Sequence, residues 1–248
     1  MAARKAGEVH KKYFNRNIRV KTKGTSINLV TAADTEAEKE IVSLIRSYFP
    51  KHNFLAEEET YKKIDSEYTW VIDPLDGTSN FSYGLPIFCV SIALLKNNEP
   101  IIGVVYDPMR DELFSAQKNC GAYLNREKIA VACASKLKEA LLITGFYYNR
   151  GKDMVANLER IRIFLSKRII GIRRLGAAAL DLCYVACGRA AGFWEFTLSP
   201  WDFAAGMLIV REAGGMVTGR YGEDITLKKS FIAASNGKIH NAMLEVLK

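Results

Sequence analysis

The sequence is poor in the residues that build thiol and imidazole metal sites. Its 248 residues include five cysteines and three histidines. The cysteines are scattered without a CxxC pair, and the histidines lie far from them in the chain. This pattern argues against a zinc site and against a disulfide framework. We expect the cysteines to be buried thiols rather than ligands.

Long apolar runs are also lacking. The longest, residues 88–95 and 101–106, are far shorter than the roughly 20 residues that a membrane helix needs. The N-terminus leads into a charged segment without the apolar core of a signal peptide. No repeat and no linker rich in Gly, Ser or Pro divides the chain. These absences predict a cytoplasmic protein with no membrane partner.

The composition is that of an ordinary globular protein, with 49% hydrophobic and 25% charged residues. The net charge of +8 indicates either a lysine-rich surface or attraction of an anion, which is a small phosphate or a nucleic acid. Basic residues crowd the segment 150–174, but no zinc-finger or RNP-type signature accompanies them. Nucleic acid is therefore not expected as the main partner.

The hydrophobic pattern predicts an α+β/α/β chain with two halves, residues 1–130 and 131–248, that form one compact unit with the active site between them. The first half contains two helices and an antiparallel sheet. We expect the first helix to reach about Arg16, a mobile loop at residues 21–26, and a capping box of Thr35 and Glu38 at the second helix. In the second half, strands alternate with helices. The expected strands are 68–72, 87–95, 100–106, 113–116, 121–124, 141–144, 169–173, 192–196 and 231–234, and the later helices are 153–165, 177–187 and 202–212.

The strongest chemical signal is the segment DPLDGT at residues 73–78. Asp73 and Asp76 follow a strand, Pro74 fixes one φ angle, and Gly77 permits a sharp turn. Two carboxylates this close repel one another unless a positive charge lies between them. Oxygen ligands favour Mg²⁺ or Mn²⁺. The same residues are also typical of an ordinary turn, so this segment alone is compatible with a metal site and with a plain acidic turn.

Two further acidic features strengthen the metal interpretation. Glu57 opens a triplet of glutamates that follows an apolar stretch, so at least one of them is expected at a strand end. Asp202 opens an apolar helix, where it is first of all a good N-cap. A helix N-terminus beside metal ions also favours phosphate, because its free amides and dipole attract anions.

The motifs together resemble those of a known family. DPLDGTSNF at residues 73–81 is similar to the DPxDGTxNF signature of inositol monophosphatases. WDFAAG at 201–206, followed by EAGG at 212–215, is similar to their WDxAAG…EAGG signature, and residues 176–191 match the segment between. The resemblance implies a layered α/β/α/β/α sandwich, two or three Mg²⁺ ions with Mn²⁺ as a substitute, lithium sensitivity and a homodimer.

The resemblance also implies roles for individual residues. Glu57, Asp73, the carbonyl of Leu75, Asp76 and Asp202 would hold metal, and Glu57, Thr78 and Asp76 would be catalytic. The residues that would bind substrate are Asp76, Gly77, Thr78, Gly176, Ala177, Ala178, Glu195 and Asp202. Glu58 would support Glu57 from behind, and the positions of the family's mobile loop and its polar anchor correspond to Lys23, Thr31 and Asp34.

The expected reaction is hydrolysis of inositol 1-phosphate by a metal-activated water. The expected substrate is a small phosphorylated polyol or sugar. Ser199 stands where many eukaryotic members have a histidine, so fructose 1,6-bisphosphate and histidinol phosphate remain alternative substrates. Arg173 and Arg174 are interpreted as surface or dimer residues, with binding of a second phosphate as the alternative. A non-enzymatic alternative is an accessory protein of RNA or of a transcription complex, against which the complete metal set argues.

Overall fold

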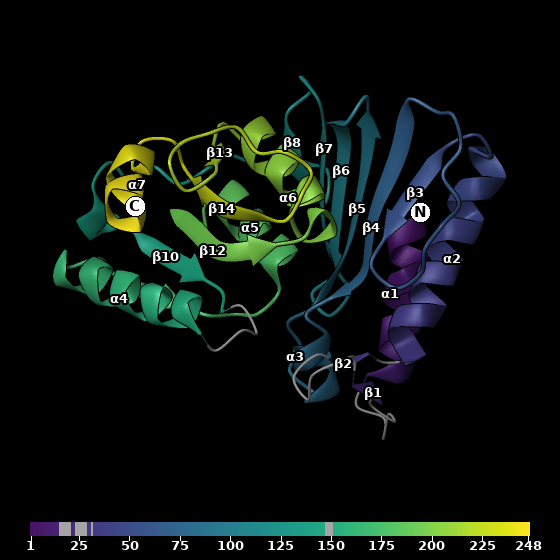
Figure 1. Cartoon of the computed structure of the whole chain (residues 1–248), viewed down its shortest axis with the longest axis horizontal. Coiled ribbons are helices and arrows are strands. Elements are labelled where there is room, and N and C mark those ends of the chain that lie inside the picture. Colours follow the sequence, from purple (N-terminus) through teal and green to yellow (C-terminus); the bar gives the residue numbers. More distant parts are fainter. Residues whose placement is uncertain (15–20, 23–28, 31, 147–150) are drawn as a thin grey trace.

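The computed structural model describes residues 1–14, 21–22, 29–30, 32–146 and 151–248. Within them the chain forms alternating layers in the order helix, sheet, helix, sheet, helix (Figure 1). The predicted layered α/β/α/β/α sandwich is therefore confirmed. No helix in the described ranges is both long enough and apolar enough to cross a membrane.

The first outer layer consists of two helices that pack on each other and on the first sheet, α1 (Ala2–Tyr13) and α2 (Ala32–Tyr48). Ala6 and Ile41 bury their side chains in one apolar core with Ile72 and Ile92 of that sheet. Two short strands between the helices pair antiparallel, β1 (Lys21–Thr22) and β2 (Leu29–Val30). The expected loop at 21–26 is thus wrong at its first two residues, because their backbone pairs with residues 29–30. The rest of that loop lies outside the described residues. The first helix ends at Tyr13 instead of near Arg16, because Phe14 leaves helical geometry with ψ at 137°.

The predicted capping box of α2 is wrong. The helix begins at Ala32, so Thr35 lies inside its first turn rather than before it. The Glu38 carboxylate instead accepts hydrogen bonds from the backbone N–H of Glu58 at 2.9 Å and of Glu59 at 3.0 Å. Glu38 therefore attaches the glutamate triplet to the helix layer.

The first sheet has seven strands in sequence order, and all neighbours are antiparallel except the parallel pair β3–β4. A tight hairpin turn joins the expected strands β5 and β6, with Lys96 paired to Glu99 and with Asn97 and Asn98 at φ 50° and 65°. The strands are β3 (Asn53–Ala56), β4 (Tyr68–Asp76), β5 (Cys89–Lys96), β6 (Glu99–Asp107), β7 (Glu112–Gln117), β8 (Ala122–Leu124) and β9 (Glu127–Lys128).

Two helices fill the layer between the sheets, α5 (Ala178–Ala186) and α6 (Pro200–Glu212) (Figure 1). Their apolar side chains belong to one core with residues of both sheets, among them Val105, Phe193 and Phe203. The backbones approach closely at glycines. A Cβ at Gly103 would lie 2.7 Å from the carbonyl oxygen of Ala205 in α6. Because glycine has no side chain, α6 can lie directly on the first sheet.

The second sheet has five strands in the order β11-β10-β12-β14-β13. Its strands β11, β10 and β12 are parallel, whereas β14 runs antiparallel to both of its neighbours. The strands are β10 (Leu141–Thr144), β11 (Gly171–Arg173), β12 (Gly192–Leu198), β13 (Met216–Thr218) and β14 (Ser230–Ser235). The last outer layer contains α4 (Lys152–Ser166) and α7 (His240–Leu247), and a short 3-10 helix, Leu137–Glu139, precedes β10.

The two sheets are made from consecutive parts of the chain, residues 53–128 and 141–235. Helix α6 nevertheless packs on strands β5, β6 and β7 of the first sheet, although it comes late in the sequence. The division into halves at residue 130 stays a prediction.

We expect the substitution Gly103→Ala to lower the free energy of unfolding by about 1–3 kcal/mol. The methyl group of the new alanine would clash with the backbone of Ala205 in α6, which cannot easily move. Denaturant unfolding measures the change. The control is Gly171→Ala, whose Cβ would meet two side chains and no backbone, the flexible end of Arg173 at 3.2 Å and Leu141 Cδ1 at 3.8 Å. Equal stability of the two variants would contradict this account of how α6 lies on the sheet.

Candidate active site

The site begins at the end of β4, where two aspartates lie on either side of a break in strand pairing. Asp73 pairs with Ser91 and Asp76 with Cys89, and the register between β4 and β5 shifts between these pairs. Residues three apart in a regular strand face opposite sides of a sheet. Because of the shift, Asp73 and Asp76 both line one cavity.

A left-handed glycine turns the chain immediately after Asp76. Gly77 has a φ of 96°, and a Cβ there would lie 2.9 Å from the carbonyl oxygen of Ile87. Thr78 then opens the short helix α3 (Thr78–Ser82) and donates a hydrogen bond from Oγ1 to the Leu75 carbonyl at 2.9 Å. Asp73 Oδ1 accepts a hydrogen bond from the Leu75 N–H at 3.0 Å. The segment is therefore fixed by its own backbone and by the space that glycine leaves.

Helix α6 brings the third aspartate. The helix begins at Pro200 with Ser199 as its N-cap, so the expectation that Asp202 is the N-cap is wrong. Asp202 is the third residue of the helix, and its Oδ2 accepts the backbone N–H of Ser199 at 2.7 Å. Ser91 Oγ donates to the Trp201 carbonyl at 3.1 Å and joins this helix start to β5.

Helix α5 holds Asp76 from the opposite side. Asp76 Oδ2 accepts the backbone N–H of Ala179 at 2.7 Å, in the first turn of α5. The Cys89 thiol lies 3.6 Å from the same oxygen and donates to it. The first turn of α5 thus gives a backbone amide to a carboxylate of the protein itself. The expectation of buried cysteines is confirmed for Cys89 and Cys183 but is wrong for Cys120 and Cys133, which are exposed.

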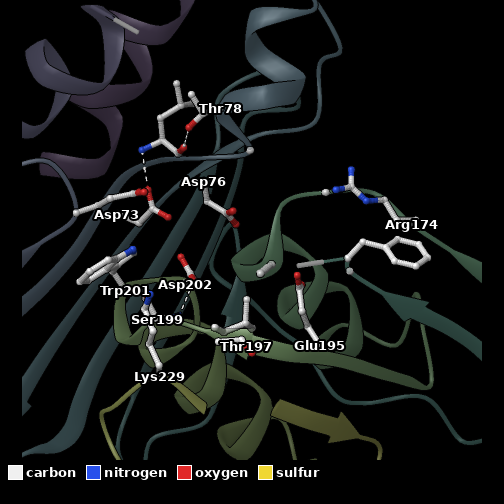
Figure 2. Close-up of a pocket in the computed structure, with 18 residues that line it drawn as sticks. Asp73, Asp76, Thr78, Arg174, Glu195, Thr197, Ser199, Trp201, Asp202 and Lys229 are labelled. Atoms are coloured by element: carbon white, nitrogen blue, oxygen red, sulfur yellow. Dashed lines mark hydrogen bonds between the residues drawn. The ribbon is translucent and has the colours of Figure 1, made fainter. Parts of the chain in front are cut away.

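The cavity encloses about 270 Å³ and collects most of the predicted residues (Figure 2). Three predicted residues do not line it: Ala177, which is buried behind the wall, Glu58 and Asp34. Lys23 and Thr31 lie outside the described residues. The predicted residues that do line the cavity are Glu57, Asp73, Leu75, Asp76, Gly77, Thr78, Gly176, Ala178, Glu195, Ser199 and Asp202, together with Arg174.

The carboxylates of the cavity raise one another's pKa. Burial raises the pKa of Asp73 well above its usual value, and the charges of Glu57, Asp76 and Asp202 add to the rise. Burial likewise raises the pKa of Asp202, with Asp76 and Glu57 as the next causes. The pKa of Asp76 is raised to about 6 by burial, against the lowering effect of the α5 amides. The site as it stands thus favours protons or another positive charge.

Glu195 lies on the other side of the cavity and depends on a glycine. A Cβ at Gly145, the residue after β10, would overlap the Glu195 carboxylate. Burial raises the pKa of Glu195 to about 8, the charge of Asp76 adds to the rise, and that of Arg174 opposes it. Asn157 of α4 fixes this wall, because its Nδ2 donates to the Gly145 carbonyl at 2.8 Å and its Oδ1 accepts from Trp194 Nε1 at 2.7 Å.

Several residues of the site were missed from the sequence. Asn80 is buried and donates from Nδ2 to the carbonyls of Ile87 and Leu175, both at 2.8 Å, so it joins α3 to the segment before α5. Gly145 follows a strand of the parallel part of the second sheet, and ligands bind at the carboxyl ends of such strands. Its position after the predicted strand 141–144 could therefore have marked it as a site residue. Lys229, which also lines the cavity, follows another lysine in an exposed stretch, and no spacing singles it out.

We expect Asp73→Asn to raise the melting temperature by a few degrees at pH 8 in EDTA, since 1 kcal/mol corresponds to about 2–4 °C at this chain length. The folded state binds protons at its raised pKa values that the unfolded state has already released. Stability is therefore lost as the pH rises through those values. The gain at pH 8 should exceed that at pH 5.5. Calorimetry tests this, with the exposed Asp224→Asn as control, and an equal gain at both pH values would contradict it.

Known proteins share this architecture and sequence. The model of the inositol monophosphatase family matches residues 1–248. An inositol-1-monophosphatase from Synechocystis is 45% identical over 229 residues, which are 92% of this chain and 79% of that protein. The crystal structure of the extragenic suppressor protein suhB from Bartonella henselae superimposes with a TM-score of 0.94 at 40% identity, covering 100% of this chain and 95% of that one.

A more distant structure was solved with ligands. An IMPase/NADP phosphatase complexed with Mg²⁺ and phosphate has a TM-score of 0.86 at 25% identity, and the match covers 98% of this chain and 90% of that one. The cavity of acidic residues, the layered fold and the full-length family match agree. The chain belongs to the inositol monophosphatase family and is a phosphoric monoester hydrolase.

Proposed function

We propose that this phosphatase hydrolyses inositol 1-phosphate with Mg²⁺. The observation that carries the proposal is the convergence of four carboxylates from three separate segments on one cavity, namely Glu57, Asp73, Asp76 and Asp202. Acidic residues rarely gather in a buried place unless a cation compensates them. Fructose 1,6-bisphosphate and histidinol phosphate are the alternative substrates. A homodimer, lithium sensitivity and a cytoplasmic location belong to the same proposal.

The donor set fits a hard divalent cation. Its members offer carboxylate oxygen, with no histidine and no ligating thiol among them, which suits Mg²⁺ or Mn²⁺. Within the described ranges, no three His, Cys, Asp or Glu side chains lie close enough to share one ion as they stand. A bound cation would relieve the mutual repulsion that contributes to the raised pKa of Asp73. When bound, Mg²⁺ supplies positive charge that lowers the pKa of water and stabilises a departing oxygen.

The remaining roles fall to residues around the carboxylates. Glu57 and Thr78 would orient the attacking water, since both side chains lie on the cavity wall. The amides of Gly77 and Thr78 would bind phosphate oxygens, because backbone N–H groups before a helix attract anions. No side chain needs to act as a nucleophile.

The alcohol side of the substrate would lie against Gly176, Ala178 and Glu195. Burial raises the pKa of the Glu195 carboxyl to about 8, and a carboxyl that holds a proton can donate as well as accept hydrogen bonds. Such a group recognises hydroxyls of a polyol. The small side chain of Ala178 leaves room for the ring.

Phosphate release with Mg²⁺ tests the function on inositol 1-phosphate, fructose 1,6-bisphosphate, histidinol phosphate, NADP and 3′-phosphoadenosine 5′-phosphate. We expect the highest kcat/KM for inositol 1-phosphate. Asp76→Asn should lower kcat about 100-fold or more while keeping the fold, because it removes a charge that holds metal and substrate. Near-normal turnover of this variant at saturating Mg²⁺ would refute the assigned role, and Asp224→Asn serves as its control.

We expect Gly145→Ala to lower kcat/KM for inositol 1-phosphate about 10- to 100-fold, since the new methyl group would displace the Glu195 carboxylate. Steady-state kinetics measures the loss. Gly171→Ala, which adds the same methyl group where only the Arg173 side chain must move, should keep wild-type kinetics. If Gly145→Ala also kept them, Glu195 would not contact the substrate.

A further inference from the structure

The two consecutive arginines before Gly176 lie in different surroundings. Both are exposed, and Arg173, the last residue of β11, donates from Nη1 to the carbonyl of Ile172 at 3.1 Å. Arg174 lines the active-site cavity, and Figure 2 shows it on the same side as Glu195. The expectation that both are surface or dimer residues therefore does not describe Arg174 fully.

The position of the Arg174 side chain depends on Gly176. This glycine has a φ of 91°, and a Cβ there would lie 2.5 Å from Arg174 Nη1 and 3.2 Å from its Cζ. The guanidinium thus lies against bare backbone at the cavity wall. A residue with a side chain at position 176 would both strain the backbone and push the guanidinium away.

The Arg174 guanidinium has donors to spare. Its charge lowers the pKa of Glu195 and of Asp181, so it acts on both carboxyls electrostatically. Among the residues that the structure describes, however, no carboxylate lies within 4 Å of it, and no hydrogen bond from its side chain is formed. Its planar fork of N–H donors suits the oxygens of a phosphate.

The charges of the cavity are arranged with opposite signs at its two ends. The carboxylates of Asp73 and Asp202 lie at the end that would hold metal ions, whereas Arg174 lies across the cavity from them (Figure 2). Lys229 also lines the cavity, but it lies beside Ser199 at the carboxylate end. Of the two cations that line the cavity in the described part of the chain, Arg174 is thus the one placed to meet the part of a substrate that points away from the reacting phosphate.

We propose that Arg174 forms a subsite for a second phosphate group, carried by the alcohol part of the substrate. The inference rests on the proposed function, because it assumes that the reacting phosphate occupies the carboxylate end. It implies that bisphosphates of small polyols and sugars bind more tightly than the corresponding monophosphates. A guanidinium that merely oriented Glu195 would act on both kinds of substrate equally.

The test compares wild type, Arg174→Gln, Arg174→Lys and Arg173→Gln on fructose 1,6-bisphosphate, fructose 1-phosphate and inositol 1-phosphate, with phosphate release as the readout. Arg174→Gln should raise KM for the bisphosphate about 10- to 100-fold, the effect of losing a charge-assisted hydrogen bond. Its kcat should change little, and kcat/KM for both monophosphates should stay within about threefold. Arg174→Lys should recover part of the affinity, because it keeps the charge without the fork.

Arg173→Gln is the matched control, since it removes the same charge one residue away without touching the cavity wall. Equal loss on all three substrates in Arg174→Gln would overturn the subsite, and so would equal effects of the two glutamine variants. If the wild type released phosphate from none of the three, the proposed function would fail by itself. Calorimetric binding of the two fructose phosphates would then decide the inference, and equal affinities in wild type and Arg174→Gln would overturn it.

Discussion

Repulsion among buried carboxylates is the constraint on which the rest of this structure depends. Asp73, Asp76 and Asp202 come from two parts of the chain, and each has one carboxylate oxygen held by a backbone amide, that of Leu75, Ala179 or Ser199 respectively. An amide can donate to a carboxylate without adding a full charge, so the acids keep their attraction for a cation. A carboxylate held through one oxygen still offers the lone pairs of the other. The fold therefore fixes the direction of the acids and leaves their charge uncompensated.

Local sequence predicted the parts of the site that local backbone determines. The turn at Gly77, the strand before Asp73 and the helix after Pro200 all follow from short-range preferences, and the ordered motifs identified the family. The exact start of a helix is decided by tertiary contacts, and this explains the two errors at helix starts. Glu38 has the spacing of a capping residue but holds the backbone of Glu58, and Asp202 lies three residues inside its helix with Ser199 as cap.

Contacts between segments that are distant in the chain could not be predicted from the sequence. The residues around Asn80 do not indicate that its side-chain amide donates to the Leu175 carbonyl, 95 residues later. The residues around Gly145 likewise do not indicate that it leaves space for Glu195. The contrast between Arg173 and Arg174 is of the same kind, because adjacent identical residues differ only in what the fold places beside them. Such facts depend on how two sheets are set against a common helix layer, and that arrangement has no local signature.

That helix layer has a consequence for how the protein can be divided. The apolar core around α5 and α6 includes Val105 and Phe114 of the first sheet together with Phe193 and Ile232 of the second. A chain cut near residue 130 would leave both fragments with a large uncovered apolar face, which promotes association. Two such fragments, produced separately, would therefore be expected to reassemble, and recovery of the acidic cavity would report that the halves had found each other.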